Sequence, residues 1–138
     1  MRSRVVEAAR RARRREERGA STVELVLYMP LLMIAMLLTV QFALVYLGSQ
    51  AATAAAREGN RVARVTGQPG DGAQRARQYA DDIGQGILKD LTVNVRQVGA
   101  QMETVVTGSA PTILPFLPDT RVTETVRGPI EEFREDTG

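Results

Sequence analysis

Residues 25–47 read LVLYMPLLMIAMLLTVQFALVYL and decide the fold of this chain. They lie within a longer interval, between Glu24 and Arg57, in which no residue is charged. A helix of 23 residues at about 1.5 Å per residue spans about 34 Å, enough to cross a hydrocarbon core of about 30 Å. Tyr28 and Tyr46 lie near its ends, where aromatic rings favour the headgroup level. The stretch predicts a membrane-spanning helix, because so small a chain cannot bury a segment that is apolar on every side.

The charges are distributed unevenly on the two sides of this segment. Residues 1–18 hold eight arginines and three glutamates, a net charge of +5, whereas the whole chain carries +2, so the remainder carries −3. The positive-inside rule therefore places the N-terminus in the cytoplasm and everything after about Gly48 outside. Clustered arginines can also bind nucleic acid. Their place directly before a membrane segment favours the topological interpretation, and we expect no nucleic-acid partner.

The composition excludes several classes of chemistry. The 138 residues allow one domain at most, and the chain has no cysteine and no histidine. Zinc sites, thiol nucleophiles and Ser-His-Asp triads therefore lack their ligands or bases. The acidic pairs Asp81–Asp82 and Glu131–Glu132 are adjacent in sequence, so on a helix their side chains diverge by about 100° and are expected to be solvated. We predict that the protein is not an enzyme and has no cofactor or metal.

The junction before the membrane segment reads Arg18-Gly19-Ala20-Ser21-Thr22-Val23-Glu24. Glycine lets a protease approach the backbone and disfavours helix, so Gly19 can mark the point where an extended leader gives way to helix. Ser21 and Thr22 can then cap the helix, with Glu24 in its first turn. A second possible cleavage region is the Ala-rich run of residues 48–56, which offers A-x-A signal-peptidase sites such as Ala52 to Ala54.

This junction resembles that of the type IV pilin superfamily, and within it the TadE-like minor pilins, or pseudopilins, of tight-adherence (Flp-type) pilus systems. The run GASTVELVLYMPLL carries Gly19, Ala20 and Glu24 at the family's spacing, with Pro30 inside the apolar segment. The AREGNR run of residues 56–61 is similar to the stretch that follows the membrane helix in that family. The resemblance covers about residues 18–66.

The resemblance implies that a prepilin peptidase in the membrane cleaves between Gly19 and Ala20 on the cytoplasmic side. It also implies that Glu24 meets the freed amine of Ala20 in a neighbouring subunit; the alternative is an interfacial acid that faces water. The implied partners are the prepilin peptidase, other pilin or pseudopilin subunits, the inner-membrane assembly platform and the lipid bilayer. The implied location is a single-pass cytoplasmic membrane protein that enters a surface pilus.

The helical pattern continues beyond the membrane to about Val65. Pro30 has no N–H for the carbonyl of Val26 and predicts a kink. A stripe of small residues on this helix lets another helix approach closely, which suits a bundle of pilin helices. The alternative is that alanine simply favours helix. The small residues are Gly48, Ala52 and Ala56, with Gly59 on the adjacent stripe. Arg57, Arg61 and Arg64 fall on one face, which we expect to be solvated near anionic headgroups.

The remaining residues predict a small exported domain. A turn-rich break covers residues 66–72 and a modest helix residues 73–90, and residues 91–95, 102–107 and 121–126 have strand character. Three prolines make residues 109–119 a connection, whose Ile113, Leu114, Phe116 and Leu117 cover the core or contact another subunit. The acidic tail 130–138 is expected to be frayed or the end of a helix.

The predicted fold class is α+β, with a long N-terminal transmembrane and stalk helix followed by a domain of one helix and about three antiparallel strands. Its parts are a leader at 1–19, a membrane helix at 20–47, a helical continuation at 48–66 and the exported domain at 67–138. Two functional alternatives remain beside the minor pilin. One is an uncleaved, membrane-anchored binding domain, and the other is a secreted domain released after the Ala-rich run.

Overall fold

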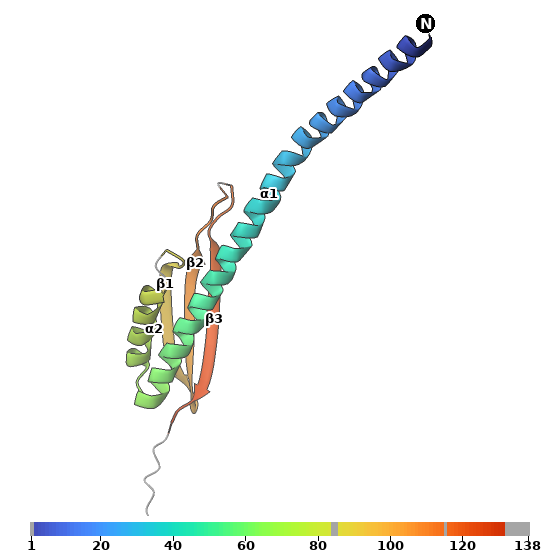
Figure 1. Cartoon of the computed structure of the whole chain (residues 1–138). Helices are drawn as coiled ribbons and strands as arrows, with labels where there is room; N and C mark the ends of the chain where they lie inside the picture. The colour runs from blue at the N-terminus through green and yellow to red at the C-terminus, as the bar shows by residue number, and fades with distance from the viewer. Residues whose placement is uncertain (1, 84–85, 115, 132–138) are drawn as a thin grey trace, which may run out of the picture. The chain divides into compact units, whose positions relative to one another are not determined.

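The computed structural model describes residues 2–83, 86–114 and 116–131, with side chains from Thr22 onward. The elements follow in the order α1 (Arg2–Thr66), α2 (Pro69–Ile83), β1 (Lys89–Val98), β2 (Gln101–Ala110) and β3 (Thr120–Pro129), as Figure 1 shows. The chain divides into two compact units, residues 1–39 and 40–138, and α1 contributes to both. The predicted α+β class is confirmed.

The first unit consists of the N-terminal part of α1. Its backbone is helical from Arg2, so the expectation of an extended leader that ends at Gly19, with caps at Ser21 and Thr22, is wrong. The physical reason is composition, because residues 7–18 are almost entirely alanine, arginine and glutamate, which are strong helix formers. The helix α1 also continues through Pro30 without interruption.

The connection between α1 and α2 is shorter than the predicted break at residues 66–72, because only Gly67 and Gln68 separate the helices. Gly67 has a φ of 66°, a left-handed conformation that favours glycine at a helix end. Thr66 Oγ1 donates to the carbonyl of Val62 and accepts from the N–H of Gln68. Pro69 then opens α2, a position where its fixed φ suits the helix and its missing N–H costs nothing.

The second helix also ends earlier than predicted. It stops at Ile83 rather than at Asp90, and Lys89 and Asp90 open β1 instead. The glycines at positions 84 and 86 weaken helix here.

The three predicted strands are confirmed, and each is extended to ten residues. They form one antiparallel sheet in the order β1-β2-β3, with Val93 opposite Val106 and Val106 opposite Glu124. Side chains alternate between the two faces, so Met102, Thr104 and Val106 of the central strand point to one face and Glu103 to the other.

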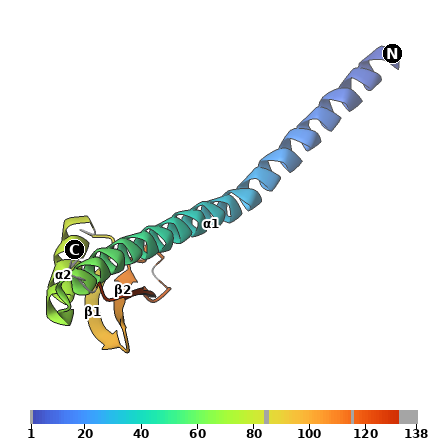
Figure 2. The ribbon, with the colours of Figure 1, turned by 90° about the horizontal axis from the view of Figure 1, so that it is seen from below.

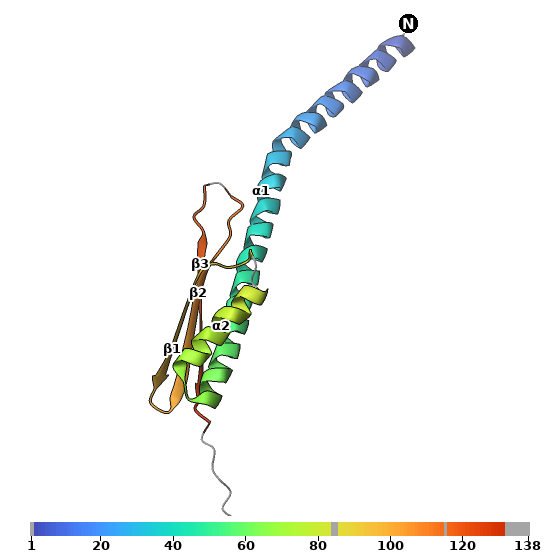
Figure 3. The ribbon, with the colours of Figure 1, turned by 90° about the vertical axis from the view of Figure 1, so that its left-hand side faces the viewer.

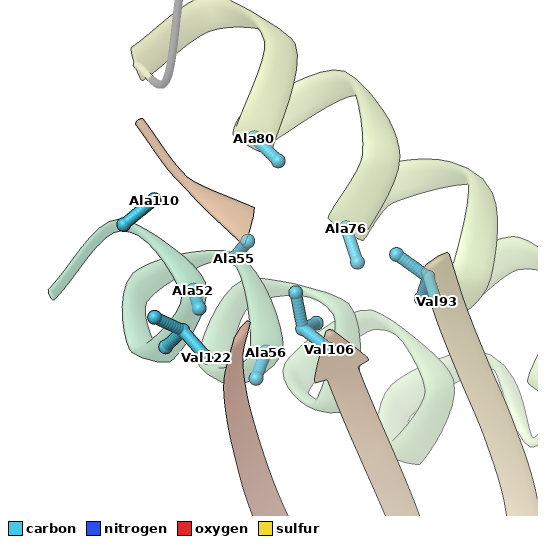
Figure 4. Close-up of a cluster of buried hydrophobic side chains, with 9 residues drawn as sticks. All are labelled: Ala52, Ala55, Ala56, Ala76, Ala80, Val93, Val106, Ala110 and Val122. Atoms are coloured by element: carbon cyan, nitrogen blue, oxygen red, sulfur yellow. The ribbon is translucent and has the colours of Figure 1, made fainter. Parts of the chain in front are cut away.

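Both helices of the second unit pack on the same face of the sheet, α2 beside the α1 residues from position 40 onward (Figures 2 and 3). The core between them consists of alanine and valine, as Figure 4 shows: Ala52, Ala55 and Ala56 from α1, Ala76 and Ala80 from α2, and Val93, Val106, Ala110 and Val122 from the strands. Such short side chains fill little space, so the helices and the sheet lie close together.

Candidate functional site

The predicted processing junction lies within α1. The bond between Gly19 and Ala20 is in helical backbone, and the side chains of both residues lie outside the part of the chain whose side chains the structure describes. Glu24 follows little more than one turn later and is exposed. The predicted acid is therefore accessible to a partner, and the pairing with an N-terminal amine stays a prediction.

Beyond Glu24 the helix presents an apolar surface on every side. Among the described residues, one helix, within Thr22–Thr66, is long and apolar enough to cross a membrane. A shallow apolar groove runs along it, lined by Val26, Met29, Pro30, Leu32, Met33 and Met36. The side chains on the opposite faces, such as Leu27 and Leu31, are exposed as well. A helix of this kind requires an apolar environment, and a single-pass anchor satisfies that requirement.

The small-residue stripe of α1 is buried inside the same chain. Ala52 and Ala56 are fully buried in the core, and Gly48 lies against Ala110 of β2. The expectation that this stripe packs against helices of other subunits is therefore wrong. Its physical basis, a close approach of backbones, is retained, but the sheet and α2 of the same chain make that approach.

The closest approach of α1 and α2 occurs at a pair of glycines. A Cβ atom built on Gly59 would lie 2.6 Å from the Cβ of Ala76 and 2.7 Å from the carbonyl oxygen of Gly72. A Cβ atom on Gly72 would likewise lie 2.6 Å from both the Cβ of Ala63 and the carbonyl oxygen of Gly59. The two helices thus meet backbone to backbone, and each needs glycine at this crossing.

Asn60 connects α1 to the sheet. Its side chain is 2% exposed, and Nδ2 lies 2.8 Å from the carbonyl oxygen of Met102 on β2 and 3.3 Å from that of Val126 on β3. The hydroxyl of Thr104 is a third neighbour of the same nitrogen, at 3.3 Å. A buried amide is stable only when such partners are present. One polar side chain therefore fixes the helix across two strands.

Glu58 connects α1 to α2. Its carboxylate accepts hydrogen bonds from Arg61 on the same helix and, at 3.0 Å, from Nε of Arg75 on α2. These two arginines lower the pKa of Glu58 from its ordinary value of 4.5 to about 2. The AREGNR run, residues 56–61, thus supplies the core alanine, the ion pair, the helix crossing and the buried amide. We refer to residues 56–61 as the docking segment.

The predicted basic face is only partly free. Arg57 is exposed and forms no ion pair within the described part of the chain. Arg61 pairs with Glu58, and Arg64 donates through Nε to the carbonyl of Pro129 at 2.6 Å and pairs with Glu131 at 3.1 Å. Arg57 and Arg61 are therefore exposed as expected, Arg61 with a partner on its own helix, whereas Arg64 corrects the expectation because it holds the end of β3 on α1.

Sequence reasoning missed a charged cluster on the outer face of the sheet. Glu103 on β2 lies between Arg96 on β1 and Arg127 on β3, and the two arginines cover it so that only 2% of its side chain is exposed. Arg96 donates through Nε at 2.6 Å and, together with Arg127, holds the pKa of Glu103 below its ordinary value. The sequence could not predict this cluster, because it depends on which residues of neighbouring strands lie opposite each other.

Sequence reasoning also missed Gln41. This residue lies inside the apolar stretch, yet it is 8% exposed because its amide binds the β2–β3 connection. A glutamine within an otherwise apolar run could have indicated that its amide binds another part of the chain.

The described residues contain no cluster of acidic, histidine or cysteine side chains that could hold a metal ion. Asp81 and Asp82 are exposed, as predicted for solvated residues. Of the other acidic pair, Glu131 binds Arg64, and Glu132 lies outside the described residues together with most of the predicted acidic tail.

Comparison with protein-family models matches residues 19–61 to the family described as TadE-like protein. The match confirms the predicted resemblance to TadE-like proteins of tight-adherence pilus systems. It begins at Gly19 and ends at Arg61, so it contains the junction, the apolar helix and the docking segment. The match covers 43 of the 138 residues, and this part of the chain is similar to that structural, pilus-associated family. The curated proteins and the solved structures give no significant match.

Proposed function

We propose that this protein is a minor pilin, or pseudopilin, of a tight-adherence type IV pilus. The observation that carries the proposal is the TadE-like match, which starts at Gly19, the residue at which the sequence predicts cleavage. In this proposal a prepilin peptidase removes the +5 leader, and α1 becomes the N-terminal element of the mature subunit.

The proposed topology is a single pass, with the N-terminus in the cytoplasm and the sheet domain outside. The arginine-rich residues 2–18 support this orientation through the positive-inside rule. The exposed apolar side chains of α1 support residence in the bilayer, and later in a bundle with other pilin subunits and the assembly platform.

Glu24 is the proposed assembly residue. A carboxylate costs about 2.5–3.5 kcal/mol at the bilayer centre and less at its edge, so Glu24 gains from a cationic partner. The partner in this proposal is the amine of Ala20 in a neighbouring subunit, freed by cleavage.

The packing of the second unit argues against release of a secreted domain. Cleavage after Ala54 would cut α1 just before the fully buried Ala55 and would remove Ala52 and Gly48, which pack in the core and against the sheet. Proteolysis concentrates at exposed loop tips and termini rather than inside a packed helix. A domain released in this way would lose part of its own core.

The N-terminal residue of protein recovered from membranes and from the surface fraction tests the processing step. An N-terminus at Ala20 supports the minor pilin. An intact leader would favour the uncleaved anchored domain, and an N-terminus near Ala55 would favour the secreted domain. Either of these two results would refute the proposal.

The assembly role of Glu24 is tested with Glu24→Ala, and Glu24→Asp serves as a matched variant that keeps the carboxylate. Glu24→Ala should insert into the membrane normally but be depleted from sheared surface fibres. Glu24→Asp should be recovered at the surface in larger amounts than the alanine variant. Equal incorporation of Glu24→Ala and unsubstituted protein would leave the acid without an assembly role.

A further inference from the structure

The connection between β2 and β3, residues 111–119, is held on α1 by the buried amide of Gln41. Gln41 Nε2 donates to the carbonyl of Pro111 at 3.3 Å, and Gln41 Oε1 accepts from the N–H of Ile113 at 3.0 Å and from the hydroxyl of Thr112 at 3.2 Å. The connection extends past the ends of β2 and β3 (Figures 1 and 3). Its place along α1 is therefore fixed by one side chain.

That place is within the apolar stretch. Gln41 lies six residues before Leu47, or about 9 Å along the helix from the end of the 25–47 stretch. If the membrane segment ends at Leu47, the connection enters the outer leaflet. A segment that ended just before Gln41 would leave residues 25–40, whose span of about 24 Å falls short of a hydrocarbon core of about 30 Å. The membrane segment therefore extends past Gln41 and brings the connection into contact with lipid.

The side chains of the connection suit that contact. Phe116 is 96% exposed, and Ile113 and Leu117 are 43% and 49% exposed. Residues 111–118 contain no charged residue, and Asp119 is the first. Isolated apolar side chains on a surface need no explanation, but three on one short connection beside a membrane helix form an apolar patch.

The backbone of the connection is also suited to the headgroup region. Unpaired N–H groups are costly near hydrocarbon. Three of residues 111–118 are prolines, which have no N–H, and two further N–H groups have partners within the chain: that of Ile113 donates to Gln41 and that of Leu117 to the carbonyl of Leu114 at 3.1 Å. Three donors remain, at Thr112, Leu114 and Phe116, and water at the headgroup level can hydrate them.

We propose that the β2–β3 connection is a second membrane contact, in which Ile113, Phe116 and Leu117 insert into the outer leaflet beside α1. The contact would fix the sheet domain against the bilayer before assembly, and extraction of the subunit into a fibre would have to break it. The inference rests on the proposed membrane anchoring by α1, and it does not depend on cleavage or pilus assembly.

Tryptophan fluorescence tests this contact, because the chain has no native tryptophan. Phe116→Trp introduces a reporter at an exposed position that should not disturb folding. The full-length variant is reconstituted at low density into phosphatidylcholine vesicles whose acyl chains are brominated near the headgroup. Val98→Trp, at the opposite end of the sheet and 49% exposed, is the matched control, and Leu32→Trp in the apolar helix reports anchoring.

We expect brominated lipid to quench the Phe116→Trp and Leu32→Trp variants strongly and the Val98→Trp variant little. Quenching of Leu32→Trp without quenching of Phe116→Trp would overturn the loop contact and leave the anchoring intact. Blue-shifted emission of Phe116→Trp without bromine quenching would indicate a protein neighbour and would equally overturn it. Absence of quenching in Leu32→Trp would overturn both the anchoring and the inference that rests on it.

Discussion

Substitution of Gly59 by alanine should destabilise the second unit, although alanine is the better helix former. The added methyl group would meet the Cβ of Ala76 at 2.6 Å and the carbonyl oxygen of Gly72 at 2.7 Å. Neither atom is the end of a flexible side chain, so α1 and α2 must separate to make room.

The expected size follows from two opposing terms. Replacing glycine inside a helix by alanine gains about 1 kcal/mol of helix propensity. Overpacking a close contact costs about 1–3 kcal/mol, and two contacts this short with rigid atoms place the cost at the upper end of that range. The free energy of unfolding should therefore fall by about 2 kcal/mol, which corresponds to a decrease in Tm of about 10 °C for a unit of this size.

Thermal unfolding of the full-length protein in detergent micelles, followed by the circular dichroism of the sheet, measures this change. Gly70→Ala is the matched control, because a Cβ atom at Gly70 has no neighbour within 4 Å and the residue lies in α2. The control should be as stable as the unsubstituted protein or slightly more so. If Gly59→Ala were also as stable, the close crossing of the two helices would be refuted.

Three further perturbations test the other contacts of the domain. Asn60→Leu keeps a similar side-chain volume but removes the donor to the carbonyls of Met102 and Val126. The free energy of unfolding, measured by chemical denaturation, should fall by about 2 kcal/mol. An unchanged denaturation midpoint would show that Asn60 does not hold the helix on the sheet. Glu58 has a lowered pKa in the folded state, so its stabilising contribution is present above pH 4.5 and is lost as the pH falls toward about 2. Over this range Tm should therefore change less with pH in Glu58→Gln than in the unsubstituted protein. An identical pH dependence of Tm in the two proteins would contradict the ion pair. Glu103→Gln removes the carboxylate that pairs with Arg96 and Arg127, so hydrogen exchange along β1 and β3 should increase. The control is Arg121→Gln, because Arg121 is exposed and forms no ion pair within the described residues. Equal protection in the two variants would show that the cluster does not hold the strands.

The parts of the fold that depend on neighbouring residues could be predicted from the sequence. The long apolar helix was predictable because residues 25–47 are apolar regardless of which face they present. The strands were predictable from alternation, as in Leu91 to Val95, since one face of the sheet is covered and the other is open. Their ends were not, because extension to ten residues depends on pairing with the next strand.

The partners of the helix faces were decided by tertiary structure alone. Local composition indicated that Gly59 and the alanines before it permit close packing, but not that the second surface belongs to the same chain. Gly59 meets Gly72, and Gln41 binds Ile113, 72 positions away. Contacts over such distances depend on the path of the chain between them, which no local periodicity specifies. The sequence by itself thus determined the long apolar helix and suggested the cleavage that we propose, whereas only the folded chain determined that the docking segment holds the domain and that Gln41 holds the β2–β3 connection on α1.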